Sequence, residues 1–182
     1  SVESGEVRTH LQDAHERIMS IANVEKFLDT KTLNEEVEVG PYLTGLCESL
    51  SKSMIGRKLE NDEPITLEVE ASGGMITSAE GISMGLITAE LVINALKHAF
   101  PGGRKGKIVV SYELTEAGWI LSVTDDGIGI NPNLPHKEGL GTSIVQSLAR
   151  QLHATVSVDT APTGTTVSIT KMAPVLSTLG VV

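Results

Sequence analysis

The chain has 182 residues, 40% of them hydrophobic, which suffices for one main core with at most a small appendage. Its 23 acidic and 14 basic residues give a net charge of −9, so no broad cationic face is available for nucleic acid, and the scarcity of aromatic residues argues against base stacking. Because Cys47 is the only cysteine, an internal disulfide and a cysteine-rich metal cage are excluded, and a reducing, cytoplasmic compartment is predicted.

Two helices are predicted before residue 57. Residues 6–28 carry apolar side chains at alternating steps of four and three, as a coiled-coil or bundle helix does. This stripe consists of Val7, Leu11, Ala14, Ile18, Ile21 and Leu28. A lone helix could not shield it, so we expect a partner helix from the same chain or from a second copy. The second helix is predicted across 41–55.

After Gly56 the pattern changes to strands and helices in alternation. The expected elements are a strand at 65–70, a helix at 79–100 closed by Pro101-Gly102-Gly103, a hairpin of strands 107–114 and 119–126, a loop at 127–141, a helix at about 142–152, and strands 154–160 and 164–171. Most neighbouring strands are joined by hairpins, which predicts an α+β two-layer sandwich with helices on one face of a mixed or antiparallel sheet. Charged Glu90 and Lys97 interrupt the most apolar stretch, so no membrane-spanning segment is predicted.

A polar stripe runs along the predicted helix at 79–100. Glu90, Asn94 and His98 are spaced by four residues and therefore share one face, with Lys97 beside them. The opposite face is aliphatic. A carboxylate and an amide on a mostly buried helix are costly unless something pairs with them, which favours a ligand or a metal ion. The alternative is an ordinary amphipathic helix whose polar stripe faces water.

Three glycine-containing segments follow at element boundaries. DDGIGI (125–130) comes directly after a strand, where Gly127 and Gly129 permit close backbone approach and Asp125 can accept a hydrogen bond from an amine. GLGTSIV (139–145) leads into a helix whose free N–H groups suit a phosphate, and GTT (164–166) opens the last strand. Taken singly, these segments also fit a tight turn, a loop before a capped helix with Thr142 or Ser143 as the cap, and a plain hairpin.

In combination and in this order, the segments resemble the nucleotide-binding boxes of the GHKL or Bergerat-fold family, shared by gyrase, Hsp90, histidine kinases and MutL. ELVINALKHA looks like the N box, DDGIG the G1 box, GLGTS the G2 box and GTT the G3 box. The segment ELVINALKHAFPGG and the arrangement of the two predicted helices in residues 6–55 further resemble sensor histidine kinases of the second HisKA class, which includes HWE-related kinases. The resemblance implies the second helix of a dimerisation and phosphotransfer bundle in 1–32 and a catalytic, ATP-binding domain in 33–182.

The resemblance also implies roles for individual residues. Asp125 would bind the adenine amino group, Asn94 would hold Mg²⁺ through its side-chain oxygen, and Glu90 would orient or deprotonate the nucleophile or order the water around the metal. Glu90, Asn94 and Lys97 are the expected catalytic residues. The expected nucleotide-binding residues are Asn94, Lys97, His98, Asp125, Gly127, Gly129, Ile130, Gly139, Leu140, Gly141, Thr142, Ser143 and either or both of Thr165 and Thr166.

The phosphoacceptor histidine of this class lies on the first bundle helix, which we expect before Ser1, so the chain looks like a fragment of a longer kinase. Its expected partners are that bundle helix, a second copy in a homodimer, and the receiver domain of a response regulator. Two other functions stay open: a serine kinase of the anti-sigma-factor type, which shares the same boxes, and a non-catalytic phosphotransfer or scaffold module that kept the fold and lost the nucleotide.

Overall fold

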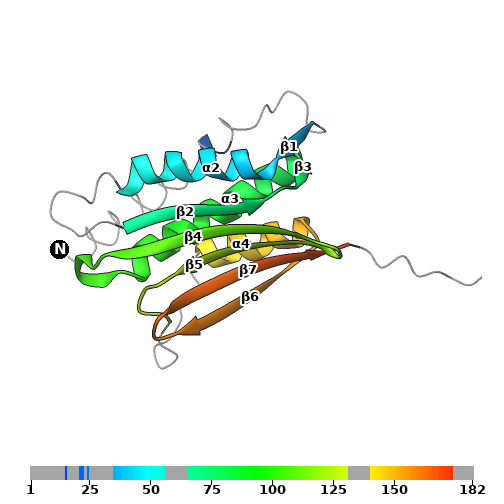
Figure 1. The fold of residues 1–182 in the computed structure, drawn as a ribbon. Coiled ribbons are helices and arrows are strands. Elements are labelled where there is room, and N and C mark those ends of the chain that lie inside the picture. Colours follow the sequence, from blue (N-terminus) through cyan, green and yellow to red (C-terminus); the bar gives the residue numbers. More distant parts are fainter. Residues whose placement is uncertain are drawn as a thin grey trace, which may run out of the picture.

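A computed structural model of the chain describes residues 15, 21, 22, 24, 35–55, 65–130 and 140–173 (Figure 1). Its centre is a five-stranded sheet in the order β2-β4-β5-β7-β6. The strands are β2 (Ile65–Ser72), β4 (Gly106–Thr115), β5 (Gly118–Asp125), β6 (Ala154–Ala161) and β7 (Gly164–Met172). β2 and β4 are parallel and every other pair is antiparallel, so the sheet is mixed.

The alternation of side chains along the strands gives the sheet one covered and one open face. In β4, Ile108, Val110 and Tyr112 are buried, and Val123 and Leu121, which lie opposite Val110 and Tyr112 in β5, are buried as well. Successive side chains of a strand point to opposite faces, so these residues share the face that packs against the helices. The predicted two-layer α+β fold with helices on one face is therefore confirmed.

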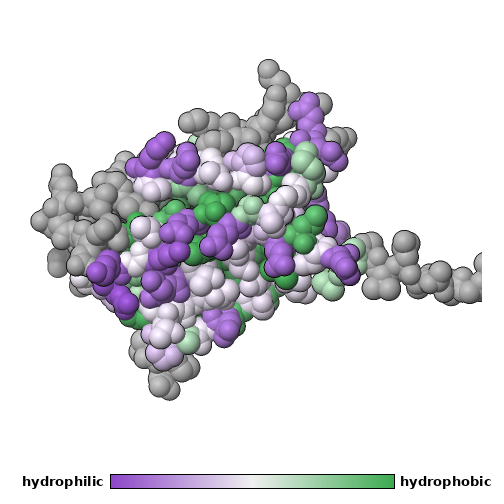
Figure 2. All heavy atoms as spheres, in the orientation of Figure 1, coloured by the Kyte–Doolittle hydropathy of each residue, from purple (hydrophilic) through white to green (hydrophobic). Residues whose placement is uncertain are grey.

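The other face of the sheet is polar and carries a ladder of hydroxyl groups. Ser122 Oγ lies 2.9 Å from Ser168 Oγ, and Thr124 Oγ1 lies 3.0 Å from Thr166 Oγ1, each pair joining β5 to β7. Figure 2 shows this side of the molecule covered largely by hydrophilic and intermediate residues. Cross-strand hydroxyl pairs of this kind stabilise the sheet without needing a second layer.

Helix α2 (Val39–Leu50) continues into a π-helical turn, Ser51–Ile55, so the two together cover the predicted helix at 41–55. Its buried side contributes Leu43, Leu46 and Leu50 to the core. The Tyr42 hydroxyl donates a 2.7 Å hydrogen bond to the carbonyl of Gly81 on α3. This bond ties α2 to the central helix, since a buried hydroxyl is costly without a partner.

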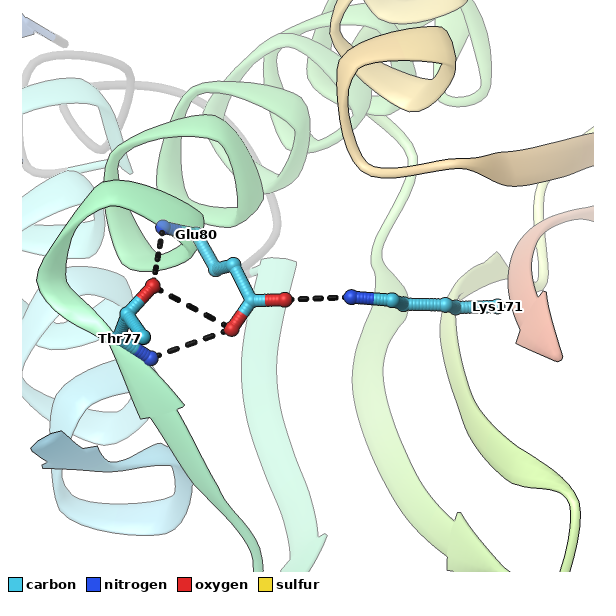
Figure 3. Close-up of polar contacts among 3 residues, drawn as sticks. All are labelled: Thr77, Glu80 and Lys171. Carbon is cyan, nitrogen blue, oxygen red and sulfur yellow. Dashed lines mark hydrogen bonds and ion pairs between the residues drawn. The ribbon is translucent and has the colours of Figure 1, made fainter. Parts of the chain in front are cut away.

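Helix α3 (Ser78–His98) is the crossover that makes the β2–β4 pair parallel. It begins with a capping box, in which the Glu80 N–H donates to Thr77 Oγ1 and the Thr77 N–H donates to Glu80 Oε2, both at 3.2 Å. Lys171 of β7 makes an ion pair with Glu80, with its Nζ 2.5 Å from Glu80 Oε1. Figure 3 shows this contact beside the capping box. One carboxylate therefore fixes the start of the helix and anchors it to the end of β7.

We expect Glu80→Gln to destabilise the fold, and more at neutral pH than in acid. Burial raises the pKa of Glu80, but the bonds from Lys171 and Thr77 outweigh it, so the pKa lies below its usual value. A lowered folded-state pKa contributes stability that is present above the unfolded-state pKa and lost as the pH falls through the folded-state pKa. Thermal melts at pH 7 should show a drop of a few degrees for the lost ion pair with Lys171, since glutamine can still complete the capping box, and the gap should narrow at lower pH.

The control for this prediction is Glu68→Gln, because Glu68 makes an ion pair with Lys107 at 2.7 Å between half-exposed side chains. Exposed ion pairs contribute little to stability. Equal melting shifts for the two variants, or a Glu80→Gln shift that is independent of pH, would contradict the assigned role.

The structure differs from the sequence prediction in two places. Short strands β1 (Glu36–Glu38) and β3 (Met75–Thr77) form a separate antiparallel pair that no alternation in the sequence predicted, because each is only three residues long. Helix α4 (Leu140–Gln151) begins at Leu140 rather than near 142. Thr142 and Ser143 therefore lie inside its first turn, and the alternative in which one of them caps the helix is wrong.

Of the predicted apolar stripe on 6–28, only Ile21 is among the described residues, and 47% of it is exposed. Val24, which the stripe did not include, is buried to 1% exposure and lies against α3 at Gly85. A side chain at Gly85 would collide with Val24 and with the Tyr42 hydroxyl. The bare backbone at Gly85 thus allows the N-terminal helical residues to pack on the central helix.

Within the described part of the chain, α3 is long and apolar enough to cross a membrane by length and composition alone. Most of that apolar surface is buried inside the fold, between the sheet and the neighbouring helices. Its composition is therefore accounted for by its position as the core helix.

Candidate functional site

The topology gathers the predicted nucleotide-binding segments at one end of the molecule. The start of β4 pairs with the end of β5, and the end of β5 pairs with the start of β7. Helix α3 ends just before β4, and α4 ends just before β6, whose first residues pair with the far end of β7. The C-terminus of α3 and the N-terminus of α4 consequently lie at the same end as the carboxyl end of β5 (Figure 1).

Asp125 is the last residue of β5 at this end, and its two carboxylate oxygens differ in their hydrogen bonding. Its Oδ1 accepts hydrogen bonds from the Gly127 N–H at 3.0 Å and from the Thr165 N–H at 3.3 Å. Among the described residues, nothing donates to Oδ2. Burial raises the pKa of Asp125, the two backbone N–H groups lower it, and the neighbouring Asp126 charge raises it, with a net upward shift. Oδ2 is thus available as a partly desolvated acceptor for an amino group.

The loop after β5 is fastened at each step to a different element. The Asp126 carboxylate accepts from the Lys107 N–H at 2.7 Å, the Ile128 N–H donates to the Ala99 carbonyl at 3.0 Å, and the Ile130 N–H donates to Thr160 Oγ1 at 2.8 Å. These bonds tie the loop to β4, to the end of α3 and to β6. The loop is therefore held in shape by the three elements around it.

Gly127 and Gly129 make this fastening possible. A Cβ at Gly127 would collide with the backbone of Ala99, and a Cβ at Gly129 would collide with the carbonyl of Ala161. Gly129 also has a φ of 68°, a conformation that L side chains rarely adopt. The absence of a side chain at Gly127 and Gly129 therefore permits the loop to touch α3 and β6.

The two threonines of the GTT segment lie on opposite faces of the sheet. Thr165 is buried on the side of Asp125, whereas Thr166 pairs with Thr124 on the open face. Of these two threonines, Thr165 is therefore the one that shares a face with Asp125, because adjacent strand residues point to opposite faces. Thr160 of β6, which the sequence did not single out, joins the group with its Oγ1 3.1 Å from Thr165 Oγ1. Counting the hairpin register outward from the turn at Pro162 would have found it.

The polar stripe of α3 leads towards this end of the fold. Glu90 is buried, Asn94 is half-buried, and Lys97 and His98 are exposed. Glu90 and Lys97 each have an interaction within the protein, so the burial of the Glu90 carboxylate does not by itself require a ligand. The Asn94 amide lies one turn beyond Glu90 on the same face. The stripe thus presents an amide oxygen, an ammonium and an imidazole at the end where the loop of Asp125 lies.

Helix α4 contributes its N-terminus. Gly141 is buried, while Thr142 and Ser143 are exposed, and Leu140 is the first described residue of the helix. The N–H groups of a first turn have no intrahelical acceptor, and the helix dipole is positive there. Gly139 lies outside the described residues. Among those that are described, the chemistry of this helix end suits an anion.

Two family models match the chain. The model described as "Histidine kinase-, DNA gyrase B-, and HSP90-like ATPase" covers residues 79–174, and one described as "Histidine kinase" covers residues 1–54. The first match contains all the segments that meet at this end of the fold. The second extends through α2 and includes the predicted bundle helix.

Named relatives are sensor kinases of greater length. The chain is 24% identical over 176 residues to blue-light-activated histidine kinase 2 of Erythrobacter litoralis, and 27% identical over 149 residues to the sensor histidine kinase PdtaS of Mycobacterium tuberculosis. These alignments take in 93% and 80% of this chain but only 49% and 28% of the relatives. The chain spans at most about half the length of the curated relatives it matches.

Solved structures show the same fold. The histidine kinase domain of the Erythrobacter litoralis blue-light-activated kinase superposes with a TM-score of 0.71 at 23% identity, over 90% of this chain and 81% of that one. The Acinetobacter baumannii histidine kinase AdeS superposes with a TM-score of 0.60 at 17% identity, over 95% and 82%. With the model match spanning more than half of its length, the chain belongs to the family of histidine kinase-, DNA gyrase B- and HSP90-like ATPases.

Proposed function

We propose that residues 33–182 form the ATP-binding catalytic domain of a sensor histidine kinase, and that residues 1–32 belong to its dimerisation and phosphotransfer bundle. The observation that carries the proposal is the arrangement at Asp125. Its Oδ1 is held by two backbone N–H groups, and its Oδ2 has no donor among the described residues. A carboxylate oxygen fixed in this way accepts an exocyclic amine, which adenine has and hypoxanthine lacks.

The phosphates and the metal ion belong on the side of α3 and α4. Asn94 would hold Mg²⁺ through its amide oxygen, together with phosphate oxygens and water, because magnesium prefers hard oxygen ligands and keeps much of its water. This donor set fits, since the half-buried Asn94 offers a hard, neutral oxygen and leaves the other coordination positions to phosphate oxygens and water. Bound magnesium would neutralise the charge that develops on the transferred phosphoryl group.

The remaining residues would position the nucleotide and the nucleophile and neutralise the charge of the phosphates. Lys97 and His98 face the phosphates with their exposed polar ends, and Gly141, Thr142 and Ser143 offer the anion-favouring first turn of α4. Glu90 orients or deprotonates the attacking nucleophile, or orders the water around the metal. Phosphoryl transfer depends chiefly on such positioning and charge neutralisation, so no covalent intermediate on this domain is needed.

The partners follow from the same proposal. The nucleophile is a histidine on a bundle helix, and the phosphoryl group then passes to an aspartate in the receiver domain of a response regulator. A second copy of the chain would supply the companion for the bundle helix in a homodimer. The protein acts in the cytoplasm.

Calorimetric titration of the purified chain tests the nucleotide site. We expect ADP and a non-hydrolysable ATP analogue to bind in the micromolar to millimolar range with magnesium, more weakly with EDTA, and GDP to bind much more weakly. A flat titration with every adenine nucleotide would refute the proposal. Incubation of the chain with ATP and the histidine-bearing bundle should give an acid-labile phosphoprotein; an acid-stable product would instead indicate a serine kinase.

We expect Asn94→Ala to abolish the magnesium-dependent part of the affinity for the ATP analogue, a loss of at least about tenfold, while binding in EDTA changes little. The reason is that the amide oxygen would act only through the metal ion. The matched control is Gln151→Ala, which removes an exposed amide at the far end of α4 and should bind like the wild type. A full magnesium response in Asn94→Ala would exclude Asn94 as the metal ligand.

A further inference from the structure

Three groups near Asp125 form a chain of hydrogen bonds that ends in the base site. The Ile130 N–H donates to Thr160 Oγ1 at 2.8 Å. Thr160 Oγ1 lies 3.1 Å from Thr165 Oγ1, and the Thr165 N–H donates to Asp125 Oδ1 at 3.3 Å. The side chains of Thr160, Thr165 and Asp125 share one face of the sheet, since Thr160 pairs with Thr165 and Thr165 with Asp125.

The first bond of this chain has only one possible direction, and it biases the second. A backbone N–H can only donate, so Thr160 Oγ1 is the acceptor of Ile130. Accepting a hydrogen bond makes a hydroxyl a better donor, because hydrogen bonds in a chain polarise one another. Within the described part of the chain, Thr165 Oγ1 is the acceptor that Thr160 can reach. Thr160 then donates to Thr165, which leaves the proton of the Thr165 hydroxyl free for another acceptor.

The backbone at Gly129 holds the first link in place. Its missing side chain lets the loop lie against Ala161, and a Cβ at this position would also come within 3.2 Å of Thr160 Oγ1. The loop after β5 and the edge strand β6 are thus brought together at Thr160. The site has two sides: Asp125 Oδ2 presents an acceptor, and Thr165 presents a donor.

We propose that Thr160 is a positioning residue that determines base specificity by orienting the Thr165 hydroxyl as a donor. This inference rests on the proposed adenine-nucleotide function. Adenine places a ring nitrogen that only accepts on each side of its amino group, whereas guanine and hypoxanthine carry an acceptor oxygen in place of the amine and a protonated nitrogen at position 1. The nitrogen at position 7 accepts in all three bases, so Thr165 discriminates only if it donates at position 1. An acceptor from Asp125 beside a donor from Thr165 at position 1 matches adenine and opposes the other two bases.

Thr160→Val tests the relay, because valine keeps the shape and strand preference of threonine and removes only the hydroxyl. We expect ADP to bind about three- to tenfold more weakly by calorimetry, the cost of losing one oriented neutral hydrogen bond. Thr160→Ser should restore the wild-type affinity. The matched control is Thr155→Val on the same exposed edge strand, where the hydroxyl donates to the Thr170 carbonyl on the open face; it should leave ADP binding unchanged.

ADP analogues that lack one ring nitrogen distinguish a lost orientation of the Thr165 hydroxyl from general damage to the site by the Thr160→Val substitution. If the relay acts through the nitrogen at position 1, Thr160→Val should bind 1-deaza-ADP as tightly as the wild type does, and its loss of affinity for 7-deaza-ADP should match its loss for ADP. Wild-type affinity for ADP in Thr160→Val would overturn the inference, as would an equal loss for ADP and for both analogues. Thr160→Ala offers a second hydroxyl-free variant should valine disturb the edge strand. A wild-type chain that binds no adenine nucleotide would refute the proposed function itself. If the wild type binds ADP and Thr160→Val binds it equally well, only this inference is refuted.

Discussion

Asp125→Asn should lower the affinity for ADP by about a hundredfold and shift the preference towards bases with a carbonyl group. The backbone decides how the asparagine would sit. The N–H groups of Gly127 and Thr165 both point at Oδ1, so the amide oxygen must take that place to accept from them. The amide NH₂ then replaces Oδ2 and presents a donor to the adenine amine. A lost hydrogen bond to a charged group and an unfavourable donor–donor contact together account for the expected loss.

Calorimetry with ADP and inosine diphosphate checks this prediction, because hypoxanthine carries an oxygen where adenine carries the amine. We expect the ratio of the two affinities to fall or invert in Asp125→Asn. The matched control is Asp159→Asn on β6, an exposed carboxylate on the open face opposite Thr166, which should leave both affinities unchanged. Unchanged ADP binding in Asp125→Asn would remove Asp125 from the base site.

Gly129→Ala should weaken ADP binding by at least about tenfold and destabilise the fold more than the same change at Gly102. Both glycines have a φ of 68°, so alanine meets the same conformational strain, about 1–2 kcal/mol, at either position. The surroundings differ. At Gly129 the added methyl group would collide with the Ala161 carbonyl, whereas at Gly102 nothing lies within 4 Å.

Relief of that collision would move the loop away from β6 and break the bond between the Ile130 N–H and Thr160. Thermal melts and ADP titrations of the two variants separate the strain from the collision. Gly102→Ala should lower the melting temperature by a few degrees without affecting ADP binding. If the two variants behave alike, the approach of the loop to β6 has no role in nucleotide binding.

Local patterns were sufficient to predict most of the elements. The alternation in 107–114 and 119–126, the helical period of 79–100 and the glycine- and proline-containing turns between them correspond to β4, β5, α3 and their connections. Each of these patterns depends on interactions within a few residues of the chain, which a sequence shows directly. The missed pair β1 and β3 lacks such a pattern, because three-residue strands are stabilised by their partner and not by their own sequence.

The residue types of the candidate site were predictable for a similar reason. A carboxylate at the end of a strand, glycines directly after it, and an amide in an otherwise aliphatic helix stand out against their neighbours in the printed sequence. What each of them contacts was not predictable. The two N–H groups that hold one oxygen of Asp125 come from residues 2 and 40 positions away along the chain.

The sequence by itself therefore determined which of the longer segments become strands and helices, that one face of the sheet is apolar, and which residue types the candidate site contains. Only the tertiary structure decided that β2 pairs with β4 in parallel, that Thr165 and not Thr166 lies beside Asp125, and that Thr160 joins them. The physical reason is range: side-chain periodicity and turn preference act between near neighbours, whereas strand order and register are set by hydrogen bonds and packing between residues far apart in the chain.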